Sequence, residues 1–357
     1  MSTVNRIFWQ DKVGVPSVIR EGPIPSKVAD HELLIKVHAW AMNPVDAYLQ
    51  VVALPFFRYP CIPGSDVSGT VELVGPAAAS KFRVGDRVVG AAMSVSGHAK
   101  AEHGGFQDYV TLDSAMTCRI PDSLSFAEAS VFPLCIATAA HALFARDFLG
   151  LPYPKAEAEA GGGEAAPAGK SVLVWGGASG VGSNAIQMAR AAGFDVVATC
   201  SPRNFEYVLG LGAAKVLDYA SPTVVADAVA ELDGGGGACA GIFQAAGPFG
   251  AVAPCCQVAH RSRQDLFVAC ANAVPEGVVP EGVRARMVFG DDTAKPMYYD
   301  TTCAIFGRFL PEALASGEYK VAPKPEIVSS KGVDGIQEAL DIVRKGVSAR
   351  KIVVVDE

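Results

Sequence analysis

Hydrophobic and polar positions alternate regularly between residues 171 and 271. Short apolar runs rich in Val, Ile and Leu predict β-strands at 171–175, 195–200, 215–219, 241–246 and 266–271. Between them, apolar residues recur at helical spacing and predict helices at 184–193, 204–213 and 223–232. Strands that alternate with helices at this spacing indicate a parallel sheet covered by helices.

The pattern differs on both sides of this region. The first 125 or so residues contain β-rich runs at 33–42, 69–75 and 86–93, separated by Pro and Gly, and a short helical segment after Asn43. Residues 125–148 are apolar at helical spacing and predict one helix with Ser125 as its N-cap. Residues 150–170 are rich in Pro, Gly, Ala and Glu and predict a surface loop, and the chain closes with a helix at 333–346 and a strand at 351–355.

Composition narrows the classes of protein that remain. The 357 residues allow two domains, and 50% hydrophobic with 19% charged residues is typical of a globular protein. The net charge of −7 argues against a nucleic-acid-binding protein. We see no apolar run of the ~18 residues that cross a membrane and no secretory signal pattern, and the nine cysteines form no CxxC pair. We therefore expect a cytoplasmic protein with reduced cysteines that binds neither nucleic acid nor membrane.

The segment after the first strand of the alternating region predicts a cofactor site. The strand 171–175 continues into the glycine-rich sequence GGASGVG, which opens a helix. The spacing is a variant of the dinucleotide-binding fingerprint, with Ser179 where the second glycine usually lies. Glycines allow close approach to a pyrophosphate, and a helix N-terminus offers amides to the anion. The predicted contacts are Gly177, Ala178, Ser179, Gly180, Val181 and Gly182; the alternative is a glycine-rich turn without a ligand.

The end of the next strand indicates which cofactor binds. An NAD site usually has an Asp or Glu there, whereas this chain has Ser201, Arg203 and Asn204. Hydroxyl and guanidinium groups suit the 2′-phosphate of NADPH. We therefore predict NADPH as the cofactor; the alternative is that Arg203 is an ordinary solvated side chain.

Several short segments together resemble the medium-chain dehydrogenase/reductase superfamily over nearly the whole chain. They are NPVD (43–46), PGSDVSG (63–69), VGDRV (84–88), GGFQDYV (104–110), AEAS (127–130), TAAHAL (138–143) and WGGASGVG (175–182). The resemblance implies an α/β fold in which a doubly wound Rossmann domain (126–300) is inserted into a GroES-like β-rich catalytic domain built from 1–125 and 301–357. Within the superfamily the chain resembles quinone and enoyl reductases, above all the fungal trans-acting enoyl reductases of polyketide synthesis. SPRNF (201–205) fits that subgroup, although its typical members have His at the position of Arg203.

The same resemblance implies that no zinc is bound. Zinc alcohol dehydrogenases of the superfamily supply a Cys and a His as ligands, and this chain has Asn43 and Ser65 at the corresponding places. The four-cysteine lobe that holds a structural zinc is also missing, since residues 94–110 contain no Cys. A catalytic zinc needs about three protein ligands, so we predict no metal site.

Without zinc, a conjugated C=C bond is an easier target than a carbonyl, because hydrogen bonds can hold the enolate charge. Tyr48 is the predicted proton or hydrogen-bond donor, and Asn43 and Thr138 are predicted to hold substrate or cofactor. Each also has a purely structural interpretation: surface packing for Tyr48, helix capping for Asn43 and helix packing for Thr138. Tyr219 resembles a tyrosine that flanks the adenosine 2′-phosphate, or it serves packing only.

Two further residues follow predicted strands at the edge where open α/β sheets bind ligands. Gly247 follows the strand 241–246 and Asn272 follows the strand 266–271, so both are predicted to border the cofactor. The segments 150–168 and 273–300 are expected to shape the mouth of the pocket.

Three functions remain open from the sequence. The first is an NADPH-dependent enoyl reductase that acts on a small or carrier-bound enoyl thioester beside a polyketide synthase. The second is a quinone or enone reductase, and the third is an NADPH-binding protein that has lost catalysis. We expect a monomer or homodimer in each case.

Overall fold

The computed structural model describes residues 4–53, 58–92, 103–155, 169–234, 237–247, 249–289 and 298–356. The chain forms two compact units. The first comprises Met1–Leu134, Asp292–Tyr299 and Phe306–Glu357, and the second Cys135–Asp291 and Asp300–Ile305. The predicted domain boundaries at 125 and 300 lie near these limits. Residues 156–168 and 290–297, which belong to the two segments expected at the pocket mouth, lie outside the described part.

The first unit is built around a seven-stranded sheet in the order β14-β15-β3-β4-β5-β7, with β6 paired to β3. Its strands are β3 (Glu32–Ala41), β4 (Asp66–Val74), β5 (Arg87–Ala91), β6 (Tyr109–Asp113), β7 (Thr117–Arg119), β14 (Lys324–Ile327) and β15 (Arg350–Val355). A separate antiparallel pair is formed by β1 (Asn5–Trp9) and β2 (Val18–Gly22). Because β15 pairs with β3 through Val353 and Ala41, both ends of the chain build one sheet. This is the two-part β-rich domain that the resemblance implies.

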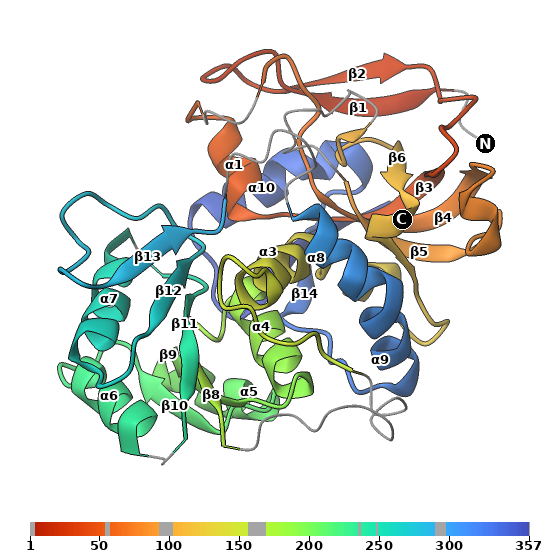
Figure 1. Ribbon diagram of the computed structural model, residues 1–357. Helices are drawn as coiled ribbons and strands as arrows, with labels where there is room; N and C mark the ends of the chain where they lie inside the picture. Colours follow the sequence, from red (N-terminus) through yellow and green to blue (C-terminus); the bar gives the residue numbers. More distant parts are fainter. Residues whose placement is uncertain are drawn as a thin grey trace. The chain divides into compact units, whose positions relative to one another are not determined.

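In the part of the chain that the structure describes, four α-helices lie wholly within the first unit. They are α1 (Pro44–Leu49), α2 (Phe126–Ala129), α9 (Leu310–Ser316), and α10 (Ile336–Arg344). A π-helical turn, Ile305–Phe309, precedes α9. Figure 1 shows α1 and α10 side by side, and the two helices are in contact.

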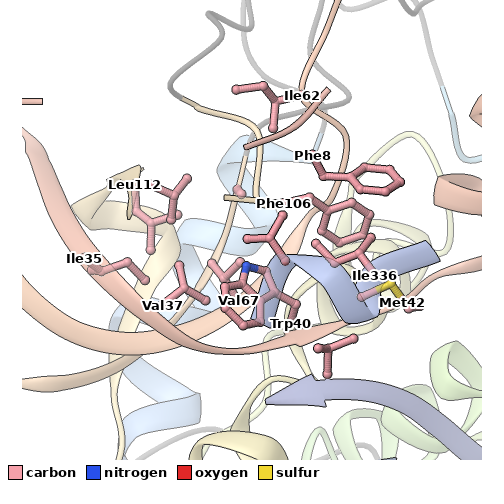
Figure 2. Packing of buried hydrophobic residues seen from close by; sticks show 14 of the residues in the cluster. Phe8, Ile35, Val37, Trp40, Met42, Ile62, Val67, Phe106, Leu112 and Ile336 are labelled. Atoms are coloured by element: carbon pink, nitrogen blue, oxygen red, sulfur yellow. The ribbon is translucent and has the colours of Figure 1, made fainter. Parts of the chain in front are cut away.

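The core of the first unit is formed by apolar side chains from β3, β4 and α10 and from the loops around them. Trp40 is fully buried at its centre and donates its indole N–H to the carbonyl of Gln107 (3.1 Å). Phe8 and Phe106 pack edge to face with ring centroids 6.0 Å apart (Figure 2). The indole needs such a partner, because an unpaired N–H in an apolar interior is costly.

The second unit is a six-stranded parallel sheet in the order β10-β9-β8-β11-β12-β13. Its strands are β8 (Ser171–Trp175), β9 (Asp195–Cys200), β10 (Lys215–Asp218), β11 (Cys239–Gln244), β12 (Phe267–Cys270) and β13 (Arg284–Met287). In chain order this is the arrangement 3-2-1-4-5-6 of the Rossmann fold, and it confirms the predicted fold class. The chain reverses direction across the sheet between β8 and β11, where such folds bind their ligands.

Helices cover both faces of this sheet (Figure 1). They are α4 (Gly180–Ala191) and α5 (Phe205–Gly210) on one face and α6 (Val224–Gly234) and α7 (Val252–Arg261) on the other. Most of the short helix α8 (Tyr299–Ala304) and most of α3 (Pro133–Phe144) also belong to this unit. A core cluster that includes Leu173, Ile242 and Cys255 fills the α6 and α7 side.

The structure corrects one expectation about elements and adds two elements, a helix and a strand, that were not expected. The single helix predicted at 125–148 is divided into α2 and α3, because Pro133 lacks an amide N–H and is tolerated only in a first helical turn. The helix α7 and the strand β13 were not predicted. The sequence of β13 is RARM, which lacks the apolar run by which the other strands of this sheet were predicted.

The expectation that no apolar run is long enough to cross a membrane is also wrong. The segment Phe126–Phe144 has the length and composition of such a span. However, 78% of its apolar window is buried inside the protein, which is typical of a core helix.

Candidate active site

The loop between β8 and α4 takes its shape from glycines. Gly176 has φ of +87°, and a Cβ there would lie 2.7 Å from the carbonyl oxygen of Ala246. A Cβ on Gly182 would lie 2.3 Å from the carbonyl oxygen of Gly176, so α4 can start this close to the strand only with glycine. Gly176 is missing from the residues predicted for this site, although it is the first glycine of the GG pair.

Backbone hydrogen bonds show which loop amides are already used. The amides of Gly176 and Gly177 both donate to the carbonyl oxygen of Thr199 (3.1 and 2.8 Å). Ser179 caps α4, since its Oγ accepts the amide of Gly182 (2.9 Å). Within the described residues, the amides of Ala178, Gly180 and Val181 have no acceptor. These three N–H groups can therefore serve an anion at the positive end of the α4 dipole.

The carboxyl end of β9 is polar and carries a basic residue. Ser201 Oγ and Tyr219 Oη are 2.9 Å apart, so two of the residues predicted to flank the 2′-phosphate are brought together. Arg203 lies in the following 3-10 turn, Pro202–Asn204, and its side chain is exposed. Asn204 ends the same turn. Asp218 ends β10, and its Oδ1 accepts a hydrogen bond from the backbone amide of Ala220 (2.9 Å).

The residues predicted beyond β11 and β12 also meet. The side-chain Nδ2 of Asn272 donates to the carbonyl oxygen of Gly247 (3.2 Å). The backbone N–H of Asn272 donates to Gln244 Oε1 (3.2 Å). Gly247 has φ of +142°, a backbone conformation that favours glycine. Because β11 adjoins the point where the chain reverses across the sheet, these residues lie at its ligand-binding edge.

In the first unit, Asn43 is part of a buried polar network. Its Nδ2 donates to Asp66 Oδ2 (2.9 Å), and Lys351 Nζ donates to its Oδ1 (2.5 Å). The ammonium of Lys351 also forms an ion pair with Asp66 (2.8 Å), and the other carboxylate oxygen accepts the amide of Leu134 (2.6 Å). Asn43 and Asp66 are 4% and 0% exposed. Asn43 is therefore held by partners from β4 and β15, two strands far apart in the sequence.

This network does not fit a catalytic zinc. Asp66 directly follows Ser65, which the resemblance places where zinc alcohol dehydrogenases have a ligand histidine, and the charge of Asp66 is balanced by Lys351. A divalent cation at this place would meet the ammonium of Lys351 at close range. No group of three or more His, Cys, Asp or Glu able to hold a metal occurs in the described ranges. The absence of zinc from this protein stays a prediction, and the donor set supports it.

Helix α1 presents Tyr48 to solvent. Asp46 accepts the amide of Asn43 (2.8 Å) and so caps the helix from within its first turn. Burial raises the pKa of Asp46 from 3.8 to about 7. Tyr48, two residues further along the helix, is 47% exposed, so its side chain is open to solvent. Thr138 belongs to the second unit and is 4% exposed in α3, which leaves both of its interpretations open.

Comparison with known proteins agrees with this architecture. The model of the alcohol dehydrogenase GroES-like domain matches residues 29–122, and that of the zinc-binding dehydrogenase family matches residues 180–262.

Two curated fungal proteins are similar to the chain over nearly its full length. The dehydrogenase azaJ of Aspergillus niger is 37% identical over 345 residues, which cover 94% of each chain. The trans-enoyl reductase himH of Aspergillus japonicus is 37% identical over 354 residues, with 99% of this chain and 98% of himH covered. Among solved structures, the mycobacterial protein Rv1454c complexed with NADPH has a TM-score of 0.67 at 22% identity, covering 98% of this chain and 99% of Rv1454c.

Proposed function

This chain belongs to the medium-chain dehydrogenase/reductase superfamily of oxidoreductases, and from that premise we propose that it is an NADPH-dependent enoyl reductase. The resemblance predicted from the sequence motifs is thereby confirmed. The proposed substrate is an α,β-unsaturated thioester of a polyketide pathway, and the proposed reaction needs no zinc.

The observation that carries the proposal is the group of side chains at the carboxyl end of β9. Ser201 and Tyr219 place two hydroxyls together, and Arg203 adds a positive charge where an NAD site usually has a carboxylate. A 2′-phosphate accepts charge-assisted hydrogen bonds from such groups. The ribose of NAD has an uncharged 2′-hydroxyl in that place and forms no ion pair with a guanidinium. The NADPH complex of the similarly folded mycobacterial protein supports the same choice.

The glycine loop fits the remainder of this cofactor. The amides of Ala178, Gly180 and Val181 would donate to its pyrophosphate, and Gly182 keeps the helix close enough for them to do so. Gly247 and Asn272 would border the nicotinamide end. When bound, NADPH supplies the hydride that is added to the β-carbon of the enoyl group.

The protein must then stabilise the enolate and allow a proton to reach the α-carbon. The phenol of Tyr48 can donate a hydrogen bond to the enolate oxygen or pass a proton, because it is accessible on α1. Asn43, whose side chain is engaged by Asp66 and Lys351, would contribute by fixing the start of α1. The similarity of the chain to himH, a trans-enoyl reductase, supports an enoyl substrate.

The direct test compares substrates and cofactors on the purified protein. NADPH oxidation is followed with crotonyl-N-acetylcysteamine, with 1,4-benzoquinone and with butanal, and each assay is repeated with NADH. We expect the highest kcat/KM for the enoyl thioester with NADPH and no turnover of the saturated aldehyde. A preference for the quinone would assign the protein to quinone reduction instead. NADPH binding without turnover of any substrate would indicate a protein that has lost catalysis.

We also propose that the protein works in the cytoplasm beside a polyketide synthase and receives its substrate on a carrier protein. The test uses one enoyl group on two carriers, an acyl carrier protein and coenzyme A. A kcat/KM at least tenfold higher with the carrier protein would support a synthase partner. Equal values would contradict it and leave a reductase of free thioesters.

A further inference from the structure

Two hydroxyl groups in the second unit form a chain that ends on the cofactor loop. Ser183, in the first turn of α4, has its Oγ 3.2 Å from the carbonyl oxygen of Gly177. The same Oγ is 2.8 Å from Tyr207 Oη on α5. Ser183 is fully buried, and neither residue was singled out from the sequence.

The direction of these hydrogen bonds follows from the groups involved. A carbonyl oxygen can only accept, so the single hydroxyl proton of Ser183 is given to Gly177. Tyr207 must then donate to Ser183. Burial raises the pKa of Tyr207 to about 12, so the phenol keeps its proton at neutral pH.

This chain fixes the orientation of one peptide group. In a trans peptide the C=O and the N–H point to opposite sides of the same plane. Holding the carbonyl oxygen of Gly177 toward Ser183 therefore directs the amide of Ala178 the opposite way. The amide of Gly177 is held as well, by Thr199, so the loop is fixed on both sides of this residue.

We propose that Tyr207 and Ser183 are positioning residues of the cofactor loop. Their hydroxyls hold the Gly177–Ala178 peptide so that the Ala178 amide joins those of Gly180 and Val181 as donors to a dinucleotide pyrophosphate. The proposal rests on the proposed function only in requiring a nicotinamide dinucleotide. Because the pyrophosphate is common to NADPH and NADH, these two residues set affinity and not cofactor preference.

The test measures binding directly, by calorimetric titration of NADPH and of NADH into the protein without substrate. Tyr207→Phe removes one hydroxyl, and we expect both dissociation constants to rise by the same factor, about three- to tenfold. Ser183→Ala should have at least this effect. The double variant should bind no more weakly than Ser183→Ala, since Tyr207 acts through Ser183. Unchanged dissociation constants in either single variant that folds, or additive losses in the double variant, would overturn the proposal.

A control with the same chemical change separates affinity from preference. Tyr219→Phe removes the hydroxyl that is bonded to Ser201, so it should weaken NADPH and spare NADH. If Tyr207→Phe behaved in that way, it would belong to the 2′-phosphate site and the proposal would be wrong. The unfolding midpoint of the cofactor-free variants identifies a purely structural role, in which the midpoint falls and the dissociation constants stay at the wild-type values.

The outcome is distinguishable from failure of the proposed function. Preference of the wild type for NADH, or no turnover of enoyl thioesters, would contradict the proposed function. The equal rise of the NADPH and NADH dissociation constants in Tyr207→Phe and Ser183→Ala could still be measured in either case. A wild type that binds neither cofactor would overturn both proposals.

Discussion

At the scale of single residues, the chemistry depends on a few hydroxyl, amide and guanidinium groups at the ends of elements. Tyr48 is accessible on α1, whereas Asn43 is buried and already engaged. Ser201 and Tyr219 are 18 residues apart in sequence and share a hydrogen bond, because the parallel strands β9 and β10 end at the same edge. The sequence identified these residues by type and position, but the partners of Asn43, Asp66 and Lys351, follow only from the folded chain.

Tyr48→Phe tests the proposed proton or hydrogen-bond donor. The change removes only the hydroxyl, so turnover of an enoyl thioester should fall by roughly 10²–10⁴ if Tyr48 is a general acid. The dissociation constant of NADPH should not change, since the loop that would bind its phosphates belongs to the second unit. The unfolding midpoint of Tyr48→Phe is the control and should stay at the wild-type value. Unchanged turnover in Tyr48→Phe would exclude Tyr48 from the chemistry.

Arg203→Ala tests the cofactor preference. We expect NADPH to bind the wild type at least tenfold more tightly than NADH, and the variant to lose most of that preference. Charge-assisted hydrogen bonds contribute about 1.5–3 kcal/mol each, and a factor of ten requires about 1.4 kcal/mol. Titration with both cofactors gives the ratio. Arg20→Ala, at an exposed arginine paired with Asp11 in the first unit, is the control. Equal affinities of the wild type for the two cofactors would contradict the prediction.

At the scale of elements, α1 is held at both ends by residues of the first unit. Asp46 caps its start, and Gln50, just beyond its end, donates to Gln337 (2.9 Å) and accepts from Arg344 (2.6 Å) on α10. A helix of six residues has little stability of its own, so these contacts keep it formed. The position of Tyr48 therefore depends on polar contacts that no local pattern reveals.

Asp46→Asn tests the buried carboxyl group through the pH dependence of stability. The folded protein holds this proton up to about pH 7, whereas the unfolded chain releases it near 3.8. The folded state thus binds more protons between these values, and the stabilisation that is present in full below pH 4 is lost as the pH rises through 7. A pKa difference of one corresponds to about 1.36 kcal/mol, so the loss in the free energy of unfolding is at most about 4 kcal/mol.

Asparagine keeps an oxygen for the Asn43 amide and cannot ionise. The variant should therefore gain stability relative to the wild type as the pH rises from 4 to 8, measured by urea unfolding at each pH. A constant difference between Asp46→Asn and the wild type over this range would contradict the prediction.

Gly182→Ala tests the close start of α4. The added Cβ would lie 2.3 Å from the carbonyl oxygen of Gly176, so the helix must shift, with a loss of about 1–3 kcal/mol of stability and weaker binding of both cofactors. Gly210→Ala in α5 meets no atom within 4 Å and should be neutral or slightly stabilising. Thermal unfolding of the two variants makes the comparison, and equal midpoints would show that the loop tolerates a side chain.

At the scale of the whole molecule, the chain divides into a β-rich unit built from both ends and a Rossmann unit between them. The long-range ion pair between Asp66 and Lys351 lies in the first unit. Asp66 directly follows Ser65, which the resemblance places where zinc alcohol dehydrogenases have a ligand histidine. Burying this pair requires that each charge be balanced by the other. The negative charge of Asp66 is therefore already neutralised by Lys351 without a metal ion.

Elemental analysis tests the prediction that no zinc is bound. After dialysis against metal-free buffer, the purified protein should contain well below one zinc atom per chain, and a chelator should change neither its unfolding midpoint nor its activity. Lys351→Met removes the ammonium, and its effect on stability should be a loss of roughly 3–5 kcal/mol from the uncompensated carboxylate. One zinc atom per chain in the wild type would remove the premise of zinc-free reduction.

The Rossmann unit could be predicted from the sequence, because alternating apolar runs and helical segments are local patterns that a parallel sheet requires. The sequence also determined the glycine loop and the residues after β9, since turn geometry and charge are properties of residue type. The strand β13 could not be predicted, because its sequence RARM contains no apolar run. The break before Pro133 was also missed, because the helical periodicity continues across it. Only the tertiary structure paired Lys351 with Asp66 and Asn43, and Tyr207 with Ser183. Such partners are distant in sequence, and their hydrogen bonds exist only once the strands and helices that carry them have packed.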